Sequence, residues 1–189
     1  MNLYNLINEE LNNYLNELFD HPLKTKYNVI NRRVEDWDVV TFRFKTNSET
    51  QYDLEFMETE TFIYNKLNNG KRLKDYIDLN HVVDDFINTV DISFTLTDRV
   101  LNDPNITNDE YAKETNKNEQ LELFNRLTYL IKTYINEYVT EIFVIGKDTK
   151  PSKLKIYKKL YQNIFSNDYM FFEGDNEGYN NGAYYFIKK

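Results

Sequence analysis

Residues 39–56 read VVTFRFKTNSETQYDLEF, and this stretch decides the fold. Apolar and polar residues alternate on both sides of the short polar turn 46–49. Successive side chains of a β-strand point to opposite faces, so each run presents one apolar face and one polar face. Two such runs joined by a short polar turn predict an antiparallel β-hairpin of Val39–Lys45 with Gln51–Phe56.

Strand patterns continue outward from this hairpin. Tyr27 opens a β region, and residues 89–98 alternate again between apolar and polar. A short apolar run over 141–145 predicts a strand that ends at Gly146. Residues 169–172 and 183–187, separated by a Gly- and Asn-rich turn, predict a second hairpin.

Helix patterns lie between these strands. Apolar residues at three- and four-residue spacing predict a long helix over 121–138. A second helix is expected from Asp148 or Thr149 to Phe165, with Pro151 in its first turn. The element order α-β-β-β-α-β-α-β-β predicts an α+β fold: a mostly antiparallel sheet with two amphipathic helices packed on one face, plus an N-terminal helix.

The N-terminal helix is expected over 3–19, within a possible contact extension at 1–21 that Pro22 closes. Residues 22–189 then form a single α+β domain. The apolar stripe of the helix packs on its own domain or docks on a neighbouring subunit, and the sequence leaves both open. The candidate interaction residues in this stripe are Leu3, Ile7, Leu11, Tyr14, Leu15 and Leu18.

A long polar stretch over 102–118 predicts an exposed loop, and loops of this length are commonly functional or disordered. We take Asp103, Asn105, Asp109 and Tyr111 as candidate contact residues. Residues 103–114 match the oxygen spacing of a calcium loop, but Asn108 stands where the sharp-turn glycine belongs. Whether this loop binds a cation stays open.

Composition excludes several classes of protein. The chain has 189 residues, of which 41% are hydrophobic and 16% aromatic, enough to bury a core and too many for a disordered chain. The net charge of −8 makes nucleic-acid binding unlikely, except through a local basic helix face. On that face, possible phosphate contacts are Lys153, Lys155, Lys158 and Lys159. We expect no signal peptide and no membrane span.

Apart from the oxygen spacing over 103–114, the chain shows no pattern of a catalytic or metal site. It has no cysteine and only two histidines, His21 and His81, far apart in the sequence. The neighbouring carboxylates Glu58 with Glu60, and Asp84 with Asp85, are the candidates for an acid–base pair, but no spacing fixes their geometry. We therefore predict a protein that is not an enzyme and that holds no metal or cofactor.

The composition and the hairpin motifs together resemble a group of phage proteins. Asn, Lys, Ile, Tyr and Phe are abundant while alanine is nearly absent, as an A/T-rich genome would produce. Thr41-Phe42-Arg43-Phe44-Lys45-Thr46, Tyr52-Asp53-Leu54-Glu55-Phe56 and the basic-aromatic run 152–160 are similar to small, mostly uncharacterised proteins of tailed bacteriophages, including low-G/C crAss-like phages.

The resemblance implies a structural virion protein, assembled in the host cytoplasm, that forms a ring in the portal, neck or tail. Its expected partners are copies of itself and other virion proteins, with no membrane. The alternative is a small acidic phage effector that binds and inhibits a host protein. Such an effector needs its carboxylates on one continuous surface, whereas here they are interspersed with lysines.

Overall fold

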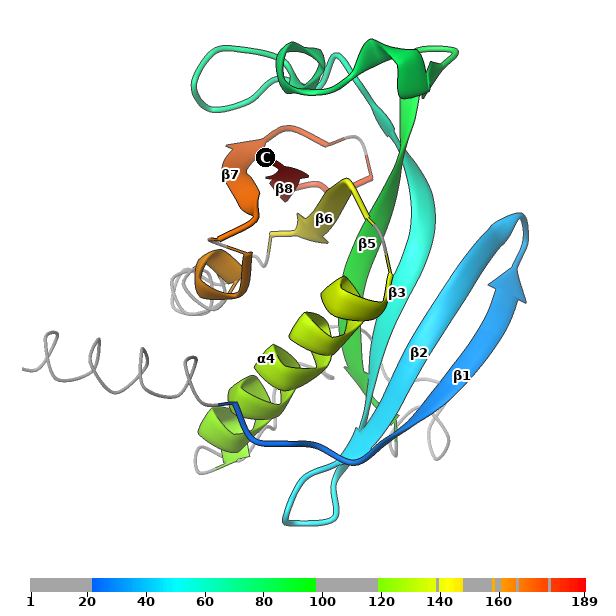
Figure 1. Ribbon diagram of the computed structural model, residues 1–189, viewed down its shortest axis with the longest axis vertical. Helices are drawn as coiled ribbons and strands as arrows, with labels where there is room; N and C mark the ends of the chain where they lie inside the picture. Colours follow the sequence, from blue (N-terminus) through cyan, green and yellow to red (C-terminus); the bar gives the residue numbers. More distant parts are fainter. Residues whose placement is uncertain are drawn as a thin grey trace, which may run out of the picture.

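The predicted hairpin is present as β2 (Trp37–Lys45) and β3 (Gln51–Phe62), and the other strands extend from it (Figure 1). Phe42 pairs with Leu54 and Phe44 with Tyr52, so the alternating apolar side chains of both strands share one face. The computed structural model describes residues 22–97, 119–138, 140–147, 158, 161–165, 167–176 and 178–189.

The remaining elements follow the chain in order. They are β1 (Tyr27–Val34), the 3-10 turns η1 (Leu73–Tyr76) and η2 (Leu79–His81), β4 (Val82–Val83), β5 (Phe86–Leu96), α4 (Glu119–Glu137), β6 (Ile142–Gly146), β7 (Tyr169–Gly174) and β8 (Ala183–Lys188). Residues 161–165 are also helical.

The described strands form one eight-stranded sheet of order β1-β2-β3-β5-β6-β8-β7, with β4 paired to the start of β5. Neighbours run antiparallel except β5 and β6, which are parallel and pair Val90 with Phe143. The predicted α+β class with a mostly antiparallel sheet is therefore confirmed. The predicted strand order was incomplete, because β1 and β4 add two strands ahead of α4.

The sheet has apolar residues on both faces where β6 and β8 run. In β8, Tyr184 and Phe186 contribute to one core, while Tyr185 and Ile187 contribute to a second core on the opposite face. All of these side chains are buried. A strand covered on both faces needs a continuous apolar run rather than an alternating one, which is why both strands are so hydrophobic.

Different parts of the chain cover the two faces. The first core contains the α4 residues Leu127, Leu130 and Ile131, together with helical residues from 161–165. The second core contains Ile63, Leu67 and other residues of the connection 63–81 between β3 and β4 (Figure 1). Residues of this connection thus bury the face of β6 and β8 opposite to the face that α4 covers.

Side-chain bonds join α4 to the start of the domain. Arg126 Nε donates to Glu122 Oε1 at 2.7 Å, and Arg126 also donates to Asn47 in the β2–β3 turn. The backbone N–H of Asn47 donates to Glu122 Oε1 at 2.7 Å. These bonds tie the tip of the hairpin to the first turns of the helix.

Three predicted features lie outside the described residues. They are the N-terminal helix at 3–19, the loop at 102–118 and most of the helix expected over 148–165. At the end of that last helix, Tyr161, Ile164 and Phe165 are buried in the first core.

Candidate functional site

A groove opens where α4 ends above strands β3 and β5. The helix stops at Glu137, and the chain turns through Thr140 into β6 beside β5. Two pockets lie there, of about 390 Å³ and about 470 Å³, and both are lined by Glu58, Tyr134 and Tyr138. Together they form what we call the α4 groove. Each is in the lower part of the size range of small-molecule sites.

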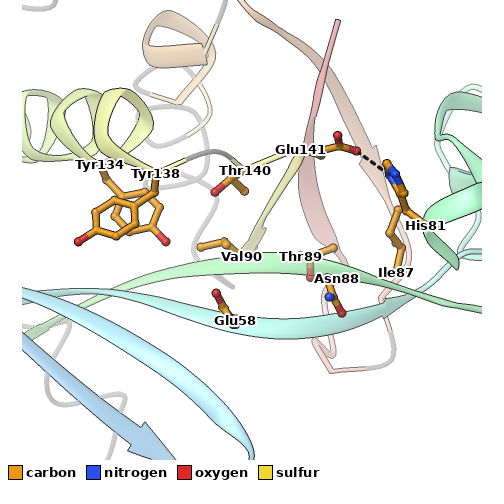
Figure 2. A pocket seen from close by; sticks show the side chains of 10 residues that line it. All are labelled: Glu58, His81, Ile87, Asn88, Thr89, Val90, Tyr134, Tyr138, Thr140 and Glu141. Carbon is orange, nitrogen blue, oxygen red and sulfur yellow. Dashed lines mark ion pairs between the residues drawn. The ribbon is translucent and has the colours of Figure 1, made fainter. Parts of the chain in front are cut away.

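One wall of the α4 groove is a stack of three aromatic rings. Phe56 of β3 and Tyr134 of α4 lie nearly parallel, with ring centroids 3.7 Å apart and an interplanar angle of 6°. Tyr138 stacks on the other face of this pair, 4.4 Å from Tyr134 at 15°. Phe56 and Tyr134 are buried, whereas Tyr138 is half-buried. Figure 2 shows the Tyr134 and Tyr138 rings lying over each other.

The floor of the groove carries a negative charge. Glu58 of β3 is exposed, and its carboxylate forms no ion pair or hydrogen bond with any described residue. Burial, reinforced by the nearby charge of Glu58, raises the pKa of Tyr134 to about 12, although a hydrogen bond with Thr140 opposes the rise. The Tyr134 phenol therefore stays protonated at neutral pH, and Glu58 supplies charge to this part of the groove.

The smaller pocket has a second carboxylate at its far end. Glu141 lies across the opening and faces His81 of η2, with 3.5 Å between Oε2 and Nδ1 (Figure 2). Both side chains are more than half exposed, so this pair contributes little to stability. Asn88 and Thr140 complete the polar lining. We call this half of the groove the Glu141 pocket.

A buried carboxylate lies on the other face of the sheet. Asp91 of β5 pairs with Val144, whose side chain belongs to the second core. The Tyr179 hydroxyl donates to Asp91 Oδ2, while Oδ1 is buried without a hydrogen-bond partner. Tyr179 reaches this position by packing over Gly146, where a Cβ atom would come within 2.4 Å of the ring. Burial raises the pKa of Asp91 to about 7.

The predicted phosphate contacts are represented here only by Lys158, since Lys153, Lys155 and Lys159 lie outside the described residues. Lys158 pairs with Glu173 of β7, and Lys147 approaches the other oxygen of the same carboxylate at 3.5 Å. Burial acts against ionisation of Glu173, yet the two lysines outweigh it and lower the pKa. The structure thus gives Lys158 an internal partner.

The predicted interaction residues also lie outside the described part of the chain. This applies to Leu3, Ile7, Leu11, Tyr14, Leu15 and Leu18, and to Asp103, Asn105, Asp109 and Tyr111. Within the part described, no group of three or more His, Asp or Glu side chains has the arrangement of a metal site. No helix there is both long enough and apolar enough to cross a membrane.

The α4 groove was not predicted from the sequence. Glu58 and Glu60, expected there only as a carboxylate pair, lie on one face of β3, where Glu58 lines the groove and Glu60 does not. Asp84 and Asp85 form the exposed turn between β4 and β5, with φ of 48° and 67°. The signal available in the sequence was the pair Tyr134 and Tyr138, four residues apart and therefore on one helix face.

Comparison of the chain with protein-family models, curated proteins and solved structures gives no match.

Proposed function

We propose that this chain is a non-enzymatic structural component of a tailed-phage virion, and that it forms a ring in the portal, neck or tail. The phage assignment is supported by an amino-acid composition typical of an A/T-rich genome, and by the hairpin and basic-aromatic motifs. The assembly assignment is supported by one observation above all, the unpaired outer edge of β1.

The geometry of the β1–β2 hairpin defines which backbone groups are free. Val34 and Trp37 flank a two-residue turn, so they form a hydrogen-bonded pair. Residues whose backbone groups bond to β2 alternate along β1 with residues whose groups point outward. Since Val34 bonds to β2, the N–H and C=O groups of Arg33, Asn31, Val29 and Tyr27 point away from β2. No described residue forms a backbone bond to them. A row of free groups of this kind is a template for a strand from another molecule.

The opposite edge of the sheet is covered at the Gly174 end of β7. Leu67 forms a bridge with Gly174 of β7, and the Asn68 N–H donates to the Glu173 carbonyl at 2.7 Å. The Asp175 N–H donates to Lys66 at 2.8 Å. The backbone bonds of the described residues leave the β1 edge open along its length, and its Val29 and Val34 side chains are 48% and 40% exposed.

A second exposed apolar surface lies at η2 and the β4–β5 hairpin, away from β1 (Figure 1). Leu79, Val83 and Phe86 are 57%, 69% and 38% exposed. Two different contact surfaces on one chain favour head-to-tail contacts between copies, and such contacts close into a ring when the rotation between copies permits. The ring proposal rests on this asymmetry together with the β1 edge.

The test replaces Val29 by proline. Proline removes the outward N–H of residue 29 but no bond to β2, and edge strands tolerate it. The matched control is Val29→Thr, which keeps the N–H and a similar shape. Size-exclusion chromatography with light scattering gives the mass of each variant, and circular dichroism checks that each is folded.

We expect the wild-type chain and Val29→Thr to form one closed oligomer and Val29→Pro to be a folded monomer. A monomeric wild-type chain at high concentration would contradict ring formation, as would an unaltered oligomer in Val29→Pro. Mass spectrometry of purified particles of the source phage tests the virion assignment separately, and absence of the chain from the particles would contradict it.

We also propose a contact role for the two segments identified in the sequence, residues 1–21 and 102–118. In this proposal an N-terminal helix docks through Leu11, Leu15 and Leu18, and a second helix over 148–165 shares a sheet face with α4. Full burial of each leucine is worth about 1.5–3 kcal/mol. Replacing all three by aspartate should prevent incorporation into particles while the domain stays folded, and normal incorporation would contradict the contact role.

A further inference from the structure

We propose that the Glu141 pocket binds a guanidinium group carried on a short aliphatic chain. The ligand is an arginine side chain of a partner or a free alkylguanidinium compound, which share this chemistry. The site is separate from the β1 edge, so it does not depend on the proposed ring.

The aromatic stack ends at the ring of Tyr138. Tyr134 has Phe56 on one face and Tyr138 on the other, so both of its faces are covered. Among the described residues, Tyr134 is the one ring that stacks on Tyr138, which is half-buried and lines the pocket. A planar cation can extend the stack on its free face, and guanidinium is the planar cation that stacks best on aromatic rings.

The carboxylate of Glu58 has no ion-pair partner among the described residues. Figure 2 shows Glu58 on β3 next to Val90 of β5, its partner across the two strands, and both line the pocket. A carboxylate accepts two parallel N–H bonds from a guanidinium, a geometry that an ammonium group cannot match. Glu58 has the charge for this contact and no cation among the described residues that would occupy it.

The charges around the rest of the pocket also favour a cation. The C-terminal end of α4 points to this side of the groove, and helix C-termini favour cations. Glu141 adds a carboxylate, and His81 is the only basic side chain lining this pocket. Arg32 and Arg33 line the other half of the groove, where Arg32 pairs with Glu55 and Arg33 donates to the Asp36 carbonyl.

The volume suits a ligand of this size. The pocket of about 390 Å³ accommodates the head group and its methylene chain, and Val90 and Ile87 supply apolar contacts for the chain. Asn88 and Thr140 provide side-chain oxygens for the guanidinium N–H groups that Glu58 leaves free.

The experiment titrates the full chain with n-butylguanidinium and with n-butylurea, which has nearly the same shape and no charge. Binding is followed by calorimetry and by the ring signals of Tyr138 in NMR spectra. We expect butylguanidinium to bind with a Kd of about 1 mM or tighter and butylurea to bind at least about tenfold more weakly. Added salt should weaken the first and leave the second unchanged.

Three variants test the residues. Glu58→Gln and Tyr138→Leu should each weaken butylguanidinium binding about tenfold. The matched control is Glu60→Gln, which removes the same charge from the same strand face outside the pocket, and it should bind like wild type. Equal weakening by Glu60→Gln, equal affinity for butylurea, or no binding of butylguanidinium would overturn the proposal.

A capped Gly-Arg-Gly peptide distinguishes the sources of the ligand. Tighter binding of the peptide than of butylguanidinium assigns the pocket to an arginine side chain of a partner. Tighter binding of butylguanidinium assigns it to a free compound, because the peptide backbone is then obstructed. Both outcomes require loss of binding in Glu58→Gln, which keeps the test decisive.

Discussion

Replacement of Asp91 by asparagine should stabilise the protein at pH 8 and have a much smaller effect at pH 4. Asparagine has the shape of aspartate and keeps an oxygen to accept the Tyr179 hydroxyl. It places an amide NH2 where the second oxygen was and removes the charge, which is costly here because Asp91 lies within the sheet beside Val144 and one of its oxygens has no partner.

The size and sign follow from the pKa of Asp91. Burial raises it from 3.8 to about 7, which corresponds to a cost of about 4 kcal/mol when the group is ionised in the folded state. The pKa of Asp91 is higher in the folded state than in the unfolded state. The protonated carboxyl therefore contributes its full stabilising effect below about pH 4. This effect is lost as the pH rises to about 7 and stays constant above that. The asparagine variant has no such loss.

Urea unfolding of wild type and Asp91→Asn at pH 4 and pH 8 measures this difference. Other carboxylates titrate in both proteins, so the gap between the two unfolding free energies isolates Asp91. Asp38→Asn, at an exposed position of β2, serves as the control and should follow wild type at both pH values. An equal gap at both pH values would refute the reasoning, since the folded state would then have no preference for the protonated carboxyl.

Three further predictions concern stability. Gly182→Ala should lower the unfolding free energy by about 2–3 kcal/mol in urea titrations, because φ is +77° and the new Cβ would lie 2.4 Å from the Gly174 carbonyl oxygen. Gly70→Ala, at φ +83° with open space around the Cβ, should cost only about 1 kcal/mol, and an equal loss at both sites would contradict the steric argument. Changing the turn Asp84-Asp85 to Asn-Gly should raise the unfolding free energy by about 1 kcal/mol, and with it the melting temperature, since both residues have positive φ. A lower melting temperature would argue against the turn geometry. Leu130→Ala, at a fully buried position of α4, should cost about 2–5 kcal/mol, and a loss below about 1 kcal/mol would show that α4 is not part of the main core.

Local alternation made the β2–β3 hairpin and β5 predictable. Each strand buries one face against α4 and leaves the other face polar, so residues such as Phe42 and Leu54 repeat with a period of two. The long helix was predictable for the matching reason, because Leu127, Leu130 and Tyr134 repeat with the period of a helix. The periodic spacing of apolar residues within each of these elements was therefore enough to predict it.

The two added strands carry little such signal. β1 is an edge strand whose Val29 and Val34 remain largely exposed, so burial places few demands on its sequence. Its turn consists of Glu35 and Asp36, without the Gly or Asn that marks most two-residue turns, although Glu35 has a φ of 56°. β4 has only two residues and depends on pairing with β5.

The α4 groove and the buried Asp91 depend on contacts between distant segments. The groove exists because α4 ends before β3 and β5 do. The relative positions of these three ends cannot be predicted from any short stretch of sequence. In the alternating pattern Asp91 is expected to face solvent. The structure instead covers that face with Tyr179, so the buried carboxylate comes from tertiary packing alone.

The position of β8 has a consequence for synthesis in the cell. β8 lies between β6 and β7 in the sheet but follows both along the chain, so neither has that neighbour until residues 183–188 leave the ribosome. Until then, Ile142–Gly146 is an apolar strand with an open edge, the kind of surface that aggregates or recruits chaperones. Slow codons between residues 147 and 183 would prolong that exposure, and the rate of translation through this interval should therefore govern how much soluble protein a cell produces.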